Sequence, residues 1–380
     1  MKLVYMIQST FNSGGTERVL VNKVNYLADK LKHDITIITT DQQNRKPFFE
    51  FSKIIKHIDL SINYLELKQW GPIPRLYHFI LKQKRHKKEL SKLLTLIRAD
   101  IVISMYGSEM RIVPFIQDNS KKILELHFSK DFRLLYEKSL NRGCVMQIMS
   151  IIRDYWEKRA INKYDKFIVL TKEDKEAWGN KKNIEVIYNA CSFKPSRKSK
   201  LEANSAIAVG RLSAQKGFDM LISVWYKVIE KHPNWKLNIF GSGEDKKKLI
   251  QQIESLNLNN NIQILSPTPN IQEEYLNSSI FLFSSRYEGF GLVLVEAMSC
   301  GLPVVAFSCP CGPKDIITDN INGYLVPNGN INEMADKICK LIENKELRND
   351  MGIKAIENSY RFSQEVIMEQ WNTLFDSLIK

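Results

Sequence analysis

The chain has 380 residues, with 55 Lys and Arg residues against 42 Asp and Glu residues, and 44% of its residues are hydrophobic. This length exceeds the roughly 250–300 residues that one hydrophobic core usually serves, so we expect two domains. The hydrophobic fraction excludes a mostly disordered chain, and no apolar run approaches the roughly 18 residues that a membrane-spanning helix needs. The apolar run after Lys2 is too short for a secretory signal, so we expect a cytoplasmic protein.

The six cysteines, at positions 144, 191, 300, 309, 311 and 339, are scattered along the chain. In a reducing compartment we expect them to be free thiols. Cys309 and Cys311 are close enough in sequence to suggest a metal, but no second Cys or His pair lies nearby. No metal site is therefore predicted.

In the first half of the chain, short β-rich apolar runs alternate with helical patterns. Strands are predicted over 3–8, 34–39, 101–104, 122–126 and 167–170, and a long helix over 16–31. A second helical pattern covers 75–98, where eight Lys and Arg residues stand against a single acid, Glu89. Its apolar residues recur at helical spacing, so the segment is predicted to be a basic amphipathic helix.

All of the excess positive charge lies in this half. Residues 1–190 hold 34 basic and 21 acidic residues, whereas residues 191–380 hold 21 of each. With the basic helix, this asymmetry favours peripheral contact with an anionic membrane surface; a helix face that is merely solvated is the alternative. No RNP-like aromatic pattern, recognition-helix signature or zinc-finger spacing is present, so no nucleic-acid partner is expected.

The second half repeats the alternation. Strands are predicted over 206–209, 236–240, 262–265, 280–283, 304–306 and 323–326, with helices over 219–231 and 245–256 among them. Such alternation predicts an α/β fold with two Rossmann-like domains, each built on a parallel sheet and facing the other across a deep cleft. We expect an N-terminal domain over 1–190, a polar linker over 191–205, a C-terminal domain over 206–358, and a C-terminal helix over 359–380 that packs back toward the first domain.

Glycines and cations follow two of these strands. Gly14 and Gly15 precede the first long helix, where a backbone without side chains can approach a ligand; a plain tight turn is equally consistent. Gly210 ends the strand over 206–209 and is followed by Arg211 and Lys216. Two cations beside a helix start suit a diphosphate, and a solvated surface loop is the alternative.

Two further turns are expected to border the same pocket. Gly241 opens a Gly-Ser-Gly turn that resembles half of a dinucleotide fingerprint, but Lys246 occupies the position of the third glycine. The segment CPCGPKDII, residues 309–317, places a tight turn after the strand over 304–306. Its backbone could border a donor sugar, and a structural turn is the equal alternative.

The segment over 284–307 is the most informative. Seven residues separate Glu288, in a loop after a strand, from Glu296, in the second turn of a helix that starts near Leu292. Gly289 and Gly291 let the loop direct its N–H groups toward a ligand, with the helix dipole behind them. Carboxylates accept hydrogen bonds from hydroxyl pairs, so the two acids suit a sugar and a ribose. Two unrelated surface glutamates are the alternative, although an acid in so apolar a helix needs a partner.

This segment resembles the E-x7-E motif of retaining family-4 glycosyltransferases with the GT-B fold. The resemblance extends to four other segments, which are Gly14-Gly15, VGRLSAQKGFD at 209–219, IYNACSF at 187–193 and NGYLVPNGN at 322–330. It is dense from about 205 to 330 and sparser across the first half. CPCGPKDII is similar to a loop in family members that build O-antigen, capsule or linked glycans from UDP-sugars.

The resemblance implies roles for the site residues. Arg211 and Lys216 would bind the diphosphate of a nucleotide sugar, Glu296 the ribose, and Glu288 the transferred sugar. The N–H groups of Phe290 and Gly291, at the start of the helix at Leu292, would bind donor sugar or phosphate. Family members usually carry a His at a strand end of the first domain, near the anomeric carbon. The candidate here is His127, and a satisfied core or loop histidine is the alternative.

The implied reaction transfers a sugar, with retention, from a nucleotide-diphosphate sugar to a hydroxyl of a glycan or an undecaprenyl-diphosphate-linked acceptor. The base is expected to be uracil by family habit. No DxD-type motif stands at a strand end, so no metal and no cofactor are expected. The first domain would bind the acceptor at the inner face of the plasma membrane, and the second would bind the donor.

Two other enzyme classes and a non-catalytic binding module are the alternatives. An oxidoreductase would need an intact dinucleotide fingerprint, which the chain lacks. A sugar-nucleotide epimerase of the same fold would have similar donor contacts but no acceptor. A non-catalytic nucleotide-sugar-binding protein would keep the two glutamates but lose the His or the cations, and all of these are present.

Overall fold

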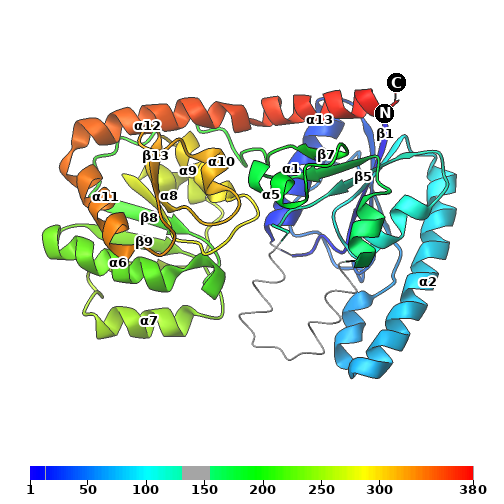
Figure 1. Ribbon diagram of the computed structural model, residues 1–380, viewed down its shortest axis with the longest axis horizontal. Coiled ribbons are helices and arrows are strands. Elements are labelled where there is room, and N and C mark those ends of the chain that lie inside the picture. Colours follow the sequence, from blue (N-terminus) through cyan, green and yellow to red (C-terminus); the bar gives the residue numbers. More distant parts are fainter. Residues whose placement is uncertain (13, 131–154, 380) are drawn as a thin grey trace. The chain divides into compact units, whose positions relative to one another are not determined.

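The computed structural model describes residues 1–12, 14–130 and 155–379. Its backbone contacts divide the chain into two compact units, and Figure 1 shows that each is built on a sheet flanked by helices. The first unit comprises Met1–Leu170, Lys175–Ile187 and Met368–Lys380, and the second comprises Thr171–Asp174 and Tyr188–Ile367. The segment 191–205, predicted as a linker, is therefore counted with the second unit.

The first unit has a seven-stranded sheet in the order β3-β2-β1-β4-β5-β6-β7. All of its strand pairs are parallel; β1 pairs with β2 through Lys2 and Asp34, for example. The strands are β1 (Lys2–Ile7), β2 (Asp34–Thr39), β3 (Lys56–Asp59), β4 (Ile101–Ser104), β5 (Lys121–Glu125), β6 (Lys166–Val169) and β7 (Ile184–Val186). Its helices include α1 (Gly15–Asp29) and α2 (Pro72–Ile97), while α5 (Lys172–Ala177) and α13 (Gln364–Ile379) contribute residues to both units.

The second unit has a six-stranded parallel sheet in the order β10-β9-β8-β11-β12-β13. Its strands are β8 (Ser205–Val209), β9 (Lys236–Phe240), β10 (Ile262–Leu265), β11 (Ile280–Phe283), β12 (Val304–Phe307) and β13 (Gly323–Val326). Its helices are α6 (Phe218–Lys231), α7 (Lys246–Ser255), α8 (Ile271–Leu276), α9 (Leu292–Ser299), α10 (Pro313–Ile316), α11 (Ile331–Glu343) and α12 (Lys345–Ser359).

Burial explains why these segments are strands. The central strands β4, β11 and β12 are buried at every position, as expected when helices cover both faces of a parallel sheet. In the second unit, α6 packs Leu221 and Trp225 into a core that also takes Leu237 from β9. The predicted fold class, an α/β protein with two Rossmann-like domains, is confirmed.

Two edge strands of the first sheet were not predicted. β3 has the sequence KHID and no fully buried residue, and β7 has only three residues. Neither carries the apolar run that marks a central strand, so their pairing with β2 and β6 is set by the sheet rather than by local sequence.

The predicted basic helix is present as α2. None of the helices in the described ranges is long and apolar enough to span a bilayer. The five cysteines in these ranges are free thiols, and Cys144 lies outside them.

Candidate active site

Both sheets share the strand order of a doubly wound fold, in which the direction of winding reverses between β1 and β4 and between β8 and β11. Open α/β sheets bind ligands at the carboxyl ends of the strands beside this reversal. In the second unit, the loops that follow β8 and β11 are 210–217 and 284–291. These loops carry the predicted diphosphate cations and the first glutamate of the E-x7-E motif.

The two loops are held together by their backbones. Gly217 has a φ of +64°, and an added Cβ would lie 2.1 Å from the carbonyl oxygen of Ser284, so only glycine fits. The Ser284 hydroxyl donates to the carbonyl oxygen of Lys216 at 2.9 Å, and the Arg286 N–H donates to that of Gln215 at 2.8 Å. The positions of Lys216 and of the loop around Glu288 are therefore set together.

Lys216 and Glu288 form an ion pair in this structure. The Lys216 Nζ lies 2.6 Å from Glu288 Oε1, and the Ser285 hydroxyl donates to the same oxygen at 2.6 Å. The Glu288 side chain is 8% exposed and that of Lys216 is 19% exposed, so both face the carboxyl edge from a largely buried position. Arg211 lies exposed on the same β8 loop, with no side-chain partner among the described residues.

Glu296 is buried in α9, eight positions after Glu288. The hydroxyl of Tyr275, from α8, donates to Glu296 Oε2 at 3.2 Å and supplies the partner that a buried carboxylate requires. Gly291 precedes α9 with a φ of +92°, the left-handed conformation that favours glycine, and Leu292 is the first residue of the helix. Within the described part of the chain, the N–H groups of Phe290 and Gly291 donate to no protein acceptor.

Several motif glycines are explained by close packing of backbones. An added Cβ on Gly241 would lie 2.0 Å from the carbonyl oxygen of Gly210, so the loops after β8 and β9 touch there. An added Cβ on Gly312 would lie 1.9 Å from the carbonyl oxygen of Phe290. The turn in CPCGPKDII thus packs directly on the loop of the E-x7-E motif, next to Gly289. These contacts give the glycines a structural reason that does not depend on a ligand.

Sequence reasoning missed the clamp between Arg286 and Asp219. The Arg286 guanidinium donates to both Asp219 oxygens at 2.8 and 2.7 Å, and also to the carbonyl oxygen of Ala214 at 2.7 Å. It thereby ties the β11 loop to the start of α6, which follows the β8 loop. Both residues lie within quoted motifs, but nothing in the sequence says that the two motifs meet.

The first unit places His127 just after β5, in a chain of buried ionisable groups. His127 Nε2 lies 3.1 Å from Glu125 Oε1, and the same oxygen accepts a hydrogen bond from Lys23 on α1. The side chains of Lys23, Glu125 and His127 are 3%, 1% and 4% exposed. Burial would raise the pKa of Glu125, but Lys23 and His127 outweigh burial and hold that pKa at about 2.

Lys23 was not predicted as part of a site. Its Nζ also lies 3.8 Å from the ring centre of Trp371, on α13, and burial lowers its pKa while Glu125 opposes that change. A signal was available, because Leu20, Lys23 and Leu27 stand at helical spacing and place a lysine within an apolar stripe. Such a lysine must have a buried partner.

Gly14 and Gly15 lie at the start of α1 in the first unit. Gly14 is extended, and an added Cβ would meet only the flexible end of Glu17. No heavy atom lies within 4 Å of an added Cβ on Gly15, so packing does not demand glycine at that position.

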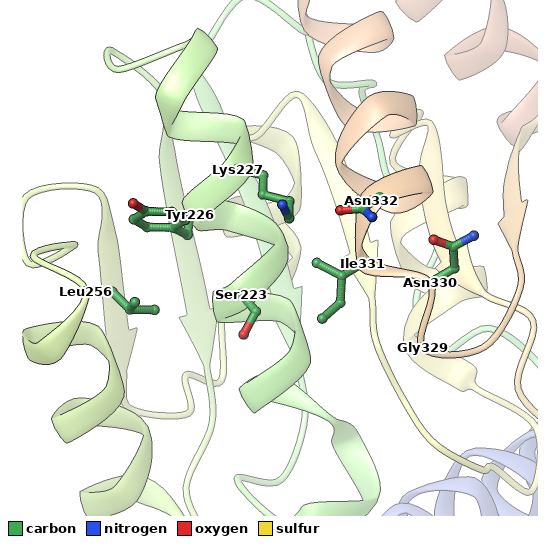
Figure 2. A pocket seen from close by; sticks show the side chains of 8 residues that line it. All are labelled: Ser223, Tyr226, Lys227, Leu256, Gly329, Asn330, Ile331 and Asn332. Carbon is green, nitrogen blue, oxygen red and sulfur yellow. The ribbon is translucent and has the colours of Figure 1, made fainter.

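A pocket of about 450 Å³ lies elsewhere in the second unit, between α6 and the turn before α11, as Figure 2 shows. The turn belongs to the motif NGYLVPNGN and contributes Gly329 and Asn330. Lys227 is the only charged residue of the eight that line it, and none of the predicted site residues is among them. It lacks the acids and paired cations expected of a donor site.

No group of three or more His, Cys, Asp or Glu side chains in the described ranges is placed to hold a metal ion.

Comparison with known proteins extends this description. The fold and the cation- and acid-bearing loops at the β8/β11 reversal define a protein of the GT-B class. The model of the family "Glycosyl transferases group 1" matches residues 192–358. An uncharacterized glycosyltransferase of Haemophilus influenzae is 33% identical over 97% of this chain and 98% of its own length. The chain therefore belongs to the group 1 glycosyltransferases.

Two more distant likenesses agree with this assignment. The amylovoran biosynthesis glycosyltransferase AmsD of Erwinia amylovora is 26% identical over 99% of both chains. A crystal structure of S. aureus TarM in complex with Fondaparinux, alpha-GlcNAc-glycerol and UDP superimposes with a TM-score of 0.79 at 21% identity. It covers 98% of this chain and 99% of the TarM chain.

Proposed function

We propose that this glycosyltransferase moves a sugar, with retained configuration and without a metal, from a UDP-sugar to a hydroxyl of a glycan or an undecaprenyl-diphosphate-linked acceptor in cell-surface polysaccharide synthesis. One observation carries the proposal: the interlocked β8 and β11 loops place Lys216 and Glu288 2.6 Å apart at the carboxyl edge of the second sheet. A sugar diphosphate bound at this edge would place its phosphates near Lys216 and a sugar hydroxyl near Glu288.

The main chemical difficulty is the negative charge that grows on the leaving diphosphate. In this proposal Arg211 and Lys216 bind that diphosphate, and the N–H groups of Phe290 and Gly291, with the start of α9 at Leu292, add partial positive charge. Preorganised charge of this kind is often the largest contribution to catalysis, and one well-placed donor is worth about 3 kcal/mol. The cations then fulfil the electrostatic role of a metal, which is why we propose metal independence.

The remaining residues would orient the donor and the reacting sugar. Glu296, fixed by Tyr275, accepts from the ribose hydroxyls, and Glu288 accepts from a hydroxyl of the transferred sugar. Gly14, Gly15, Gly210 and Gly289 would let the backbone approach a ligand at the carboxyl edge of their own sheet, and Gly241 would hold the β9 loop against Gly210 beside the donor. By the family resemblance, His127, whose Nε2 lies 3.1 Å from Glu125 Oε1, would act near the anomeric carbon of the donor sugar.

The relatives support the finer parts of the proposal. UDP and alpha-GlcNAc-glycerol are present in the TarM structure, which supports a UDP-sugar donor and an α-linked product. AmsD is named for amylovoran biosynthesis, which supports a polysaccharide product. The basic first half and α2 support acceptor binding by the first domain and peripheral contact with the cytoplasmic face of an anionic membrane.

A panel of nucleotide-diphosphate sugars tests the function directly. We expect UDP-sugars to raise the melting temperature of the chain more than GDP- or ADP-sugars do, because ligands stabilise the state that they bind. With an acceptor, we expect release of UDP that survives EDTA and an α-linked product in the proton NMR spectrum. An isomerised sugar from UDP-sugar alone would identify an epimerase, and binding without turnover on any acceptor would identify a binding module.

A further inference from the structure

The N-terminal half of α2 exposes a concentrated apolar surface. Nineteen large apolar side chains are exposed in the described ranges, and six of them lie between positions 70 and 81. They are Trp70, just before α2, and Ile73, Leu76, Tyr77, Ile80 and Leu81 on the helix, and together we call them the apolar end of α2. Ile73 is 85% exposed, whereas Leu90 and Leu94 in the other half of the helix are buried in the core. Exposed apolar patches of this kind mark a surface that contacts another protein or a membrane.

The same helix forms one wall of a pocket of about 300 Å³ in the first unit. Phe79 and Ile80 of α2, with Phe115 opposite, give it apolar walls. Lys84, Lys87 and Arg111 also line it, and none of its lining residues in the described ranges is a carboxylate.

The cations of the pocket differ in how far they are already engaged. Arg111 pairs with Glu157 at 3.1 Å, but Lys84 and Lys87 are exposed and make no ion pair with any described residue. Lys82, by contrast, donates to the carbonyl oxygens of Ile62 and Asn63 and serves the fold. No carboxylate in the described part of the chain therefore neutralises the charge of these two lysines.

Apolar groups and cations lie on a single face of α2. Ile73, Tyr77, Ile80, Lys84 and Lys87 follow one another at intervals of four, three, four and three residues, which aligns them along the helix. The face is apolar toward the N-terminal end of α2 and cationic further along. Figure 1 shows α2 as a long helix on the outside of the first unit. An anionic bilayer offers acyl chains directly beneath phosphate oxygens, which is the complement of this face.

We propose that this face binds an anionic phospholipid at a membrane surface. The lipid phosphate lies in the pocket among Lys84, Lys87 and Arg111, and the apolar end of α2 enters the boundary between head groups and acyl chains. The inference rests on the proposed function in one respect, which is that the acceptor is carried by a membrane. Its test needs no catalytic turnover, so the two can fail separately.

Co-sedimentation of the full chain with vesicles tests the proposal. Vesicles of phosphatidylcholine with phosphatidylglycerol are compared with vesicles of phosphatidylcholine alone, at low and at physiological salt. We expect the chain to bind the anionic vesicles and the double variant Lys84→Gln, Lys87→Gln to bind them about 25-fold more weakly, which is about fivefold for each cation. The double variant Ile73→Ser, Tyr77→Ser should lose binding at both salt concentrations, because it loses apolar contact rather than charge.

The matched control removes equal charge from the second unit, through Lys246→Gln and Lys247→Gln on exposed positions of α7. It should bind anionic vesicles as the unaltered chain does. Equal losses in the control and the α2 charge variant would overturn the proposal in favour of general attraction. Binding of inorganic phosphate or diphosphate that Lys84→Gln, Lys87→Gln removes, without any binding to the anionic vesicles, would overturn it in favour of a soluble anion. A dimer in sedimentation velocity that Ile73→Ser, Tyr77→Ser dissociates would overturn it in favour of a second copy of the chain.

Discussion

At the scale of single residues, Lys216 and Glu288 engage each other, although the sequence suggested separate partners for them, a diphosphate and a sugar hydroxyl. Ser285 donates to the same oxygen of Glu288. Because of this second donor, Lys216 can turn toward a phosphate without leaving the carboxylate unpaired. This arrangement is consistent with a lysine that leaves Glu288 and binds the diphosphate when a donor is present.

Lys216→Ala is expected to lower the transfer rate about 100- to 1000-fold, because one preorganised donor to the leaving diphosphate is lost. The unfolding transition should shift less than in the Lys23 and Glu125 variants, since Ser285 still donates to Glu288 and the Lys216 side chain is 19% exposed. Initial rates of UDP release and a melting curve check both points. Lys227→Ala, at the pocket of Figure 2, is the control and should retain the unaltered rate. An unimpaired rate in Lys216→Ala would contradict the diphosphate assignment.

Lys23 and Glu125 lead to a prediction that separates structure from chemistry. Either Lys23→Met or Glu125→Gln alone leaves a buried charge without its partner, which typically costs about 3–5 kcal/mol. The double variant removes both charges and should regain much of that stability. Under the proposed role of His127, the transfer rate of the double variant should stay low, because the histidine has lost the carboxylate that lies 3.1 Å from its ring.

We would measure the free energy of unfolding and kcat as a function of pH for the three variants. These two measurements show whether Glu125 contributes to stability alone or also to the transfer rate. Recovery of both stability and rate in the double variant would show that Glu125 serves only the fold. Loss of stability without recovery would mean that the two side chains do not act as a pair.

At the scale of elements, the sequence predicted every strand of the second sheet, including its edge strands β10 and β13, but missed the edge strands β3 and β7 of the first sheet. β11 and β12 are apolar runs bounded by turns, and their predicted positions agree with the structure to within one residue. β3 and β7 depend on a neighbouring strand for their pairing, which local sequence does not encode. The site follows the same division. The motif residues could be identified one by one, but the contacts of Gly241 with Gly210 and of Arg286 with Asp219 arise only from the order of the strands.

Gly241→Ala tests whether the loops after β8 and β9 must touch. The new Cβ would lie 2.0 Å from a backbone oxygen that cannot rotate away, so the loops must separate. We expect a loss of about 1–3 kcal/mol in the free energy of unfolding and a raised KM for the donor. Gly71→Ala is the matched control, because Gly71 has a φ of −63° and no atom lies within 4 Å of its added Cβ. Equal stability of both variants would contradict the close contact.

At the scale of the whole molecule, the fold class followed from the alternation of strands and helices, whereas the domain bounds and the roles of the site residues stay predictions. A predicted boundary depends on composition, and the segment 191–205 is indeed polar. Yet Ser199 donates to the carbonyl oxygen of Ser278 at 2.6 Å, so this polar segment is built into the second unit. Composition alone does not distinguish a linker from a segment whose polar groups are satisfied.

The stability of the first unit should depend on pH through His86. Burial lowers the pKa of His86 to about 4, whereas in the unfolded chain it titrates near 6.5. Between these values the unfolded chain binds the extra proton, so the free energy of unfolding falls as pH falls from 6.5 to 4, by about 3 kcal/mol in all. Chemical denaturation at neutral pH and near pH 4 measures this loss. His86→Gln should show a correspondingly smaller loss, and an unchanged pH dependence would exclude His86 as its source.

The last turns of α13 belong to the first unit although they are some 180 positions beyond its other residues. Trp371 covers Lys23, and Phe375 meets His33 ring to edge. A gene shortened to the first 187 codons would therefore encode a first unit that lacks Trp371 and Phe375. The Lys23 ammonium and the His33 ring would then lose these packing partners. Supplying 364–380 as a separate peptide should restore its solubility, and an excised first unit should be designed as these two pieces joined.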